Sequence, residues 1–177
     1  MSAASKICIQ MNVKVGATPW AVQTKHDYFK KKNVMYGAIS LSKGAKGYTL
    51  AFVGTINNEC TKVFSDCKLN IQARESIPSQ TLESVFVDWA KSYYQNNNKK
   101  VPDTIILYRE GLSDVQAKTQ LANSEIPALH RMAEIIGEKT KVKNYKPETM
   151  IVLVNKKINT RFFNMGRQGQ QANKFIP

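Results

Sequence analysis

The chain has 177 residues, 42% of them hydrophobic, so one domain with a buried core is the expected organisation. Its 26 basic and 13 acidic residues give a net charge of +13, which favours a polyanionic partner such as nucleic acid. A lysine-rich surface that only keeps the protein soluble is the alternative. No apolar run approaches the ~20 residues of a membrane span, and no signal peptide is visible.

The three cysteines, Cys8, Cys60 and Cys67, show neither disulfide nor metal-ligand spacing and indicate reduced thiols of an intracellular protein. Two histidines make a histidine-rich metal site unexpected. The composition therefore predicts a protein of the cytoplasm or nucleus that does not enter a membrane.

Residues 3–71 contain four segments that predict strands. Residues 3–14 alternate apolar and polar side chains and, from propensity alone, predict a strand; a Gly- and Pro-containing turn follows at 16–19. Three further strands joined by tight turns predict an antiparallel meander, at residues 34–42, 48–57 and 59–71.

Residues 79–94 form the strongest predicted helix, because apolar side chains recur on one face of a 3.6-residue repeat. These side chains are Leu82, Val85, Phe86, Trp89 and Tyr93. Ser79 or Thr81 is the expected N-cap.

The stretch from Thr104 to Asp114 predicts a buried strand that stops at a glycine and turns into a helix. Arg109 and Glu110 stand at the carboxyl end of this strand, where open α/β sheets place their chemistry. An ordinary strand-to-helix turn, with Gly111 present for its backbone freedom, has the same pattern.

A second helix is predicted from about Val115, and Pro127 must kink or split it because proline lacks the amide donor. Gly137 is the expected stop. The buried face of this second helix is predicted at Leu129, Met132, Ala133 and Ile136. Residues 149–155 predict a fully buried strand, and the polar tail from Gly166 is expected to be mobile.

The segment Tyr108–Gln116, followed by Asn123–Pro127, resembles the Tyr-Arg-Asp-Gly region of PIWI-clade Argonaute proteins. Three other stretches match the same family in the same order, at residues 7–14, 51–57 and 154–163. The resemblance implies an α/β, RNase H-like mixed sheet, with three antiparallel strands followed by parallel strands, flanked by helices.

The resemblance also implies a division of the chain. Residues 1–18 correspond to the end of a MID-like domain and its linker, so residues 3–14 become a helix. Residues 19–177 correspond to a partial PIWI domain whose final helices are expected to lie beyond Pro177.

Nucleases of this type hold two divalent metals between converging carboxylates. The family's first aspartate corresponds to Ile39, or to Ser40 if the match shifts by one residue, and neither side chain is a carboxylate. The second aspartate corresponds to Glu110, whose additional methylene displaces the ligand by roughly an ångström. An ion pair with a nearby basic side chain is the alternative role for Glu110, and Asp114 is expected to start a helix.

The family's mobile glutamate falls near Pro78, with Glu75 and Glu83 out of register, and the last ligand would follow Pro177. The resemblance therefore implies no catalytic residues, no bound catalytic metal and no slicer activity.

The guide-binding positions are better preserved. Gln10 and Lys14 correspond to residues at the pocket for the guide RNA 5′ phosphate, where Mg²⁺ assists in PIWI relatives. Lys156, Lys157 and Arg161 resemble the residues that hold the seed backbone. Solvated surface lysines or a basic loop are the alternatives.

Two hypotheses follow. The first is a PIWI module that binds single-stranded guide RNA and its target through the phosphate backbone without cutting. The second is a degenerate PIWI lobe that acts as a structural or protein-interaction subunit of a larger assembly.

Overall fold

The computed structural model describes residues 2–22, 31–71 and 77–155 of the chain. Its elements, in order, are α1 Ala3–Lys14, β1 Val34–Gly44, β2 Gly47–Thr55, β3 Val63–Ile71, α3 Ser79–Asn96, β4 Thr104–Glu110, α4 Asp114–Gln120, the π-helical turn Leu121–Glu125, α5 Ile126–Thr140 and β5 Glu148–Val154.

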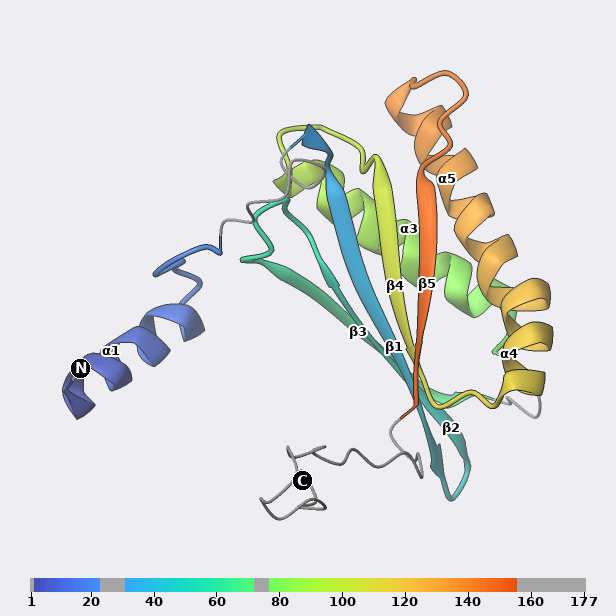
Figure 1. Ribbon diagram of the computed structural model, residues 1–177, viewed down its shortest axis with the longest axis horizontal. Helices are drawn as coiled ribbons and strands as arrows, with labels where there is room; N and C mark the ends of the chain where they lie inside the picture. Colours follow the sequence, from blue (N-terminus) through green and yellow to red (C-terminus); the bar gives the residue numbers. More distant parts are fainter. Residues whose placement is uncertain (1, 23–30, 72–76, 156–177) are drawn as a thin grey trace, which may run out of the picture.

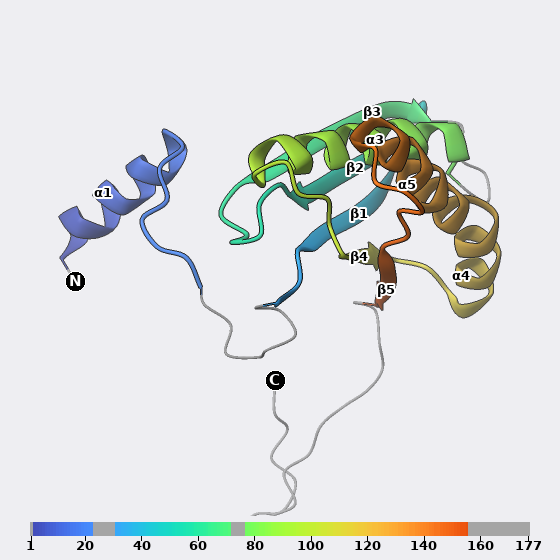
Figure 2. The same ribbon diagram turned by 90° about the horizontal axis from the view of Figure 1, so that it is seen from above.

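The strands form one sheet in the order β3-β2-β1-β4-β5. The first three strands pair antiparallel, whereas β1, β4 and β5 run parallel to one another. Helices α3 and α5 pack together on one face of the sheet, and no other described element covers the opposite, open face (Figures 1 and 2). The predicted mixed sheet and its antiparallel meander are confirmed.

The core lies between the sheet and α3, and Trp89 is at its centre. The predicted apolar face of α3 is fully buried, which confirms the periodicity argument. The Trp89 indole packs edge-on against Phe52, with ring centroids 4.9 Å apart, and its Nε1 donates a 2.9 Å hydrogen bond to the Thr55 carbonyl. It lies so close to Gly54 that any Cβ atom there would overlap with the indole.

Local propensity was wrong for residues 3–14, which form a helix as the family resemblance implied. Ser2 caps α1 by accepting a hydrogen bond from the Ser5 amide, and no side chain of α1 is buried. The alternating apolar residues therefore pack against no strand neighbour. The predicted cap of α3 was also wrong: Pro78 is the N-cap without a side-chain bond, and Ser79 donates to Glu83 instead.

Pro127 splits the second helical segment, as predicted. A π-helical turn precedes it, and Pro127 falls in the first turn of α5, where a missing amide donor costs little. The predicted buried face of α5 is confirmed. Gly137 does not end the helix, which continues to Thr140 and is closed by left-handed Lys141. The Tyr145 side chain packs closely against Gly137, so a side chain at this position would require Tyr145 to shift.

The prediction of a fully buried last strand was wrong. Among the described strands, β5 pairs with β4 alone and lies at the edge of the sheet, with Met150 56% and Leu153 38% exposed. Its apolar composition reflects sheet pairing rather than cover on both faces.

Tyr93 gives a testable consequence of this packing. Its hydroxyl is buried and has no hydrogen-bond partner among the described residues, and burial raises the pKa of Tyr93 well above the ordinary value. Replacement by phenylalanine is expected to keep or raise the free energy of unfolding at neutral pH, because an unpaired buried polar group is removed. Because the pKa of Tyr93 is higher in the folded than in the unfolded state, its contribution to stability is present below pH ~10 and is lost as the pH rises further. The free energy of unfolding, measured by urea denaturation from pH ~8 to ~11, should therefore fall less steeply for Tyr93→Phe than for the unchanged protein.

Tyr145→Phe is the contrasting variant. The Tyr145 hydroxyl donates a 2.8 Å hydrogen bond to the Pro102 carbonyl, so its removal should cost about 1 kcal/mol at neutral pH. Equal destabilisation by both variants at neutral pH would contradict the assignment of Tyr93 as unpaired.

Candidate functional site

Two polar side chains meet where β1 and β4 approach their carboxyl ends. The Ser40 hydroxyl donates a 3.1 Å hydrogen bond to the Glu110 carboxylate. The parallel register aligns Ile39 with Arg109, and side chains alternate between faces along a strand. Ser40 and Glu110 therefore lie on the open face, whereas Ile39 and Arg109 point toward the helices.

Ile39 and Ser40 are the two alternative matches to the first aspartate of the nuclease site, and they lie on opposite faces of β1. Ile39 is 2% exposed and belongs to the core under α3, so no substitution there could place a ligand beside Glu110. The one-residue alternative, Ser40, lies beside Glu110 on the open face. Strand register decides this point, because a shift of one residue moves a side chain to the other face.

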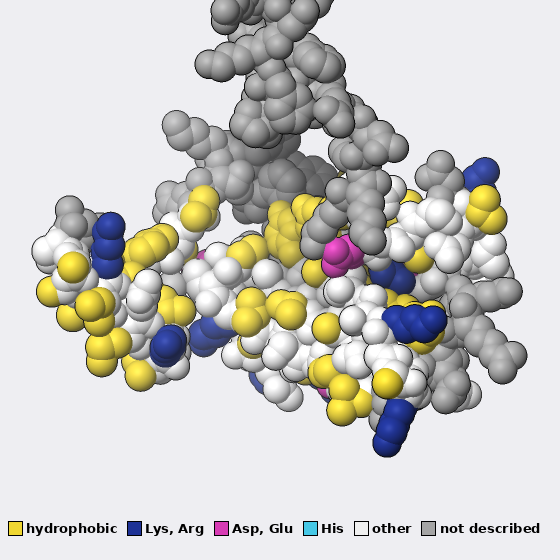
Figure 3. All heavy atoms as spheres, turned by 90° about the horizontal axis from the view of Figure 1, so that it is seen from below, with side chains coloured by type: hydrophobic (Ala, Val, Ile, Leu, Met, Phe, Trp, Pro, Cys, Tyr) yellow, Lys and Arg dark blue, Asp and Glu magenta, His cyan; other side chains and the backbone are white. Residues whose placement is uncertain are grey.

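The surroundings of Ser40 and Glu110 are mostly apolar. Ser40 and Glu110 line a shallow hollow of about 250 Å³ on the open face. The other side chains that line this hollow include Ala38, Ala51, Val53, Tyr108 and Val154. Figure 3 views the molecule from below and shows few acidic side chains among the hydrophobic and uncharged surface that is visible there.

The remaining predicted carboxylate positions are Pro78 and its neighbours Glu75 and Glu83. Pro78 is exposed at the start of α3, and Glu83 accepts a hydrogen bond from Ser79; Glu75 lies outside the described residues. Within residues 2–22, 31–71 and 77–155, no three His, Cys, Asp or Glu side chains group closely enough to hold a metal ion. Among the described residues, the site thus supplies one carboxylate and one hydroxyl, whereas converging carboxylates hold the two metals of RNase H-type nucleases.

A buried ion pair behind the site was not found from the sequence. Arg109 Nε donates to Glu125 Oε1 at 2.7 Å, and the two side chains are 2% and 0% exposed. Arg109 also donates to the Glu110 backbone carbonyl, and Gln120 donates to Glu125. This cluster joins the end of β4 to the π-helical turn. The available signal was an arginine in a buried strand, followed by a glutamate just before Pro127.

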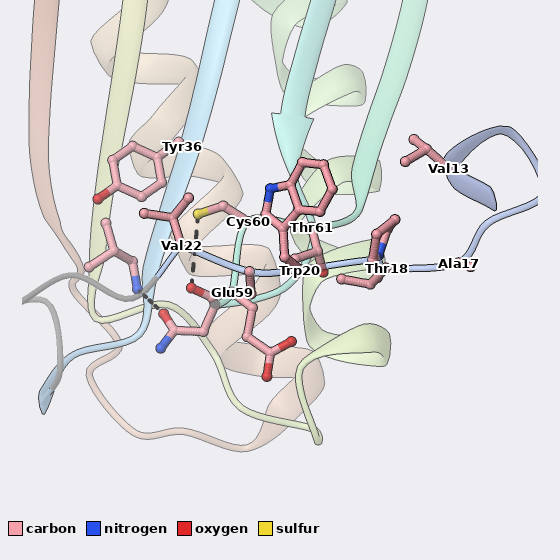
Figure 4. A pocket seen from close by; sticks show the side chains of 13 residues that line it. Val13, Ala17, Thr18, Trp20, Val22, Tyr36, Glu59, Cys60 and Thr61 are labelled. Carbon is pink, nitrogen blue, oxygen red and sulfur yellow. Dashed lines mark hydrogen bonds between the residues drawn. The ribbon is translucent and has the colours of Figure 1, made fainter. Parts of the chain in front are cut away.

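Gln10 and Lys14 lie one turn apart on α1, and both are exposed. Figures 1 and 2 show α1 standing apart from the sheet, so the structure does not bring these residues to Glu110. After α1 the chain passes the beginning of β1, where Trp20 and Tyr36 contribute to a cavity of about 520 Å³ (Figure 4). The other predicted RNA contacts, Lys156, Lys157 and Arg161, fall outside the described residues.

The sheet order, the parallel pair β1–β4 and the polar residues at its end define an RNase H-like α/β domain. Solved structures with the same fold include the Kluyveromyces polysporus Argonaute with a guide RNA, at a TM-score of 0.73 and 18% identity, covering 90% of this chain and 18% of that one. Drosophila Piwi aligns at a TM-score of 0.60 and 20% identity, covering 85% of this chain and 19% of that one.

The Piwi domain family model matches residues 1–177, and the chain belongs to this family. Piwi-like protein 1 of Gallus gallus is 30% identical over 164 residues, 90% of this chain and 17% of that protein. Piwi-like protein Ago3 of Bombyx mori is 31% identical over 170 residues, 95% of this chain and 17% of that protein. The chain thus spans about a sixth of the length of these relatives. Among the described helices, none is long and apolar enough to cross a membrane.

Proposed function

We propose that this Piwi domain holds the phosphate backbone of a single-stranded guide RNA and does not cleave the paired target. Family membership and the net charge of +13 support RNA binding. The observation that carries the second part is the hydroxyl of Ser40 beside Glu110, where cleavage of the RNase H type requires a second carboxylate.

The proposed contacts fall in two places. Gln10 and Lys14, on the exposed surface of α1, contact the guide 5′ phosphate with assistance from Mg²⁺, and residues 1–18 belong with a preceding MID-like domain. Val154, at the end of β5, pairs with Glu110, and Lys156, Lys157 and Arg161 follow it in the sequence. Lysine and arginine at these positions supply charge for phosphates without reading sequence. Such a module acts in the cytoplasm or nucleus.

Salt-titrated binding of single-stranded RNA tests the proposal. The triple variant Lys156→Ala, Lys157→Ala and Arg161→Ala is expected to lower the slope of log K against log salt by about 2, because each phosphate contact contributes about 0.7. The matched control removes the same charge from β3, α3 and α4, through Lys68→Ala, Lys91→Ala and Lys118→Ala. Equal slopes for the triple variant, the control and the unchanged protein would contradict the proposed contacts.

The absence of cleavage is checked on the same complexes. A guide paired to a labelled target is incubated with Mg²⁺ or Mn²⁺, and no cut product is expected. Cleavage that Glu110→Ala abolishes would overturn this half of the proposal while leaving RNA binding intact.

A protein-interaction role is the second candidate, because the open face of the sheet carries exposed apolar side chains. Val53, Tyr108 and Met150 are 48%, 41% and 56% exposed there. An apolar polypeptide surface is the partner that such a face fits. No measurable RNA binding at low salt would favour this role over the first.

A further inference from the structure

Two loops meet at the end of the sheet opposite Ser40 and Glu110, where the parallel strands begin. Residues 97–103 lead into β4 and residues 141–147 lead into β5, and both loops lie at the upper end of the sheet in Figure 1. The Tyr145 hydroxyl bonds to the Pro102 carbonyl at 2.8 Å, and the Glu148 amide bonds to the Asp103 carbonyl at 2.9 Å. The loops therefore form one continuous surface.

This surface, called the lysine surface below, carries five exposed lysines: Lys99, Lys100, Lys141, Lys143 and Lys146. None of the five forms an ion pair with a carboxylate of the described chain. The sequence from Lys139 to Pro147 contains no acidic residue. Asp103 is close by, and its carboxylate accepts two hydrogen bonds from Asn33. Glu138 lines a hollow with Lys141 and Lys143, whereas Glu134 and Glu148 pair with Arg131 and Lys32. The five lysines outnumber Asp103 and Glu138, so the surface keeps a net positive charge.

The backbone of both loops is fixed by hydrogen bonds rather than left to solvent. The Lys99 amide bonds to the Tyr94 carbonyl, and the Val142 amide bonds to the Gly137 carbonyl. Lys99 and Lys141 adopt left-handed backbone conformations that these bonds hold. The Lys99 ammonium also lies 5.5 Å from the centre of the Tyr94 ring. The lysines consequently project from ordered positions, which lowers the entropic cost of binding an anion.

We propose that the lysine surface is a second binding site for an RNA phosphate backbone, separate from the proposed guide contacts. β4 has seven residues and separates this surface from Glu110 by about 20 Å. One bound guide segment at the carboxyl ends of the strands does not explain charges at their amino ends. The inference takes RNA as the ligand from the proposed function, but it rests on different residues.

The side-chain chemistry favours phosphate over an acidic peptide. All five basic residues are lysines, whose ammonium groups act as point charges toward phosphate oxygens. Arginine, whose planar fork matches carboxylates in pairs, is absent from both loops. The expected binding is independent of sequence and strongly dependent on salt.

The experiment compares the unchanged protein with the variant Lys99→Ala, Lys100→Ala, Lys141→Ala and Lys143→Ala, using fluorescent oligouridine of about 8 and about 40 nucleotides. Loss of up to four phosphate contacts should reduce the salt slope for the long oligonucleotide by up to about 3. At low salt its affinity should fall at least about tenfold. Circular dichroism checks that the exposed substitutions leave the fold intact.

The matched control removes four lysines elsewhere, through Lys6→Ala, Lys68→Ala, Lys91→Ala and Lys118→Ala, and gives the same net charge. A slope for the lysine-surface variant equal to that of the control or of the unchanged protein would overturn the inference. Binding of labelled polyglutamate in preference to oligouridine would also overturn it.

The outcome separates this inference from the proposed function. If substitution of Lys156, Lys157 and Arg161 has no effect while the lysine-surface variant loses slope, the guide contacts fail and the second site stands. The reverse pattern removes the second site and keeps the guide contacts.

Discussion

Replacing Arg109 by methionine is expected to lower the free energy of unfolding by about 3–5 kcal/mol, measured by urea denaturation at neutral pH. The variant leaves the Glu125 carboxylate fully buried without its 2.7 Å partner. The second carboxylate oxygen of Glu125 has no hydrogen-bond partner among residues 2–22, 31–71 and 77–155, so the remaining Gln120 bond cannot replace a guanidinium. The carboxylate must then stay charged in an apolar setting or take up a proton, and both outcomes destabilise the fold.

The double variant Arg109→Met and Glu125→Leu is the control for this prediction. It removes both charges together and is expected to recover most of the lost stability, because a buried pair is often replaceable by apolar groups of similar volume. Additive losses in the double variant would show that the two residues act independently and would contradict the ion pair.

Replacing Trp89 by alanine is expected to cost a similar amount, about 3–5 kcal/mol, because the indole is fully buried at the centre of the core. The variant also leaves the Thr55 carbonyl without the indole donor and removes the aromatic contact with Phe52. Chemical denaturation followed by far-ultraviolet circular dichroism measures the loss without depending on tryptophan fluorescence.

Gly54 provides the coupled test. In the unchanged protein, Gly54→Ala is expected to cost about 1–3 kcal/mol, because its Cβ overlaps with the Trp89 indole. In the Trp89→Ala background the same substitution should cost much less, since the overlap is gone. Equal costs in both backgrounds would mean that the glycine serves backbone freedom rather than the close approach of the indole.

The two stability predictions concern the structure that holds the candidate site. Arg109 fixes the end of β4 from the core side, and Glu110 projects from the next residue onto the open face. Trp89 fixes α3 against β2, the neighbour of β1, which carries Ser40. Loss of either anchor is therefore expected to disturb the spacing of Ser40 and Glu110 as well as the stability.

The sequence by itself determined the element types wherever the apolar period was clear. The period of 3.6 residues identified the buried face of α3, and the alternating strands with short turns identified the meander. Pro127 marked the break before α5 because proline has no amide to donate. The four family-like stretches identified α1 as a helix, which local propensity missed.

The tertiary structure decided what depends on register and on distant neighbours. Ser40, rather than Ile39, stands beside Glu110 because the parallel pairing of β1 with β4 sets which side chains share a face. β5 is an edge strand because no described strand pairs beyond it, which its apolar sequence does not reveal. The pair Arg109–Glu125 joins residues sixteen positions apart, and only the folded chain brings two such charges together out of water.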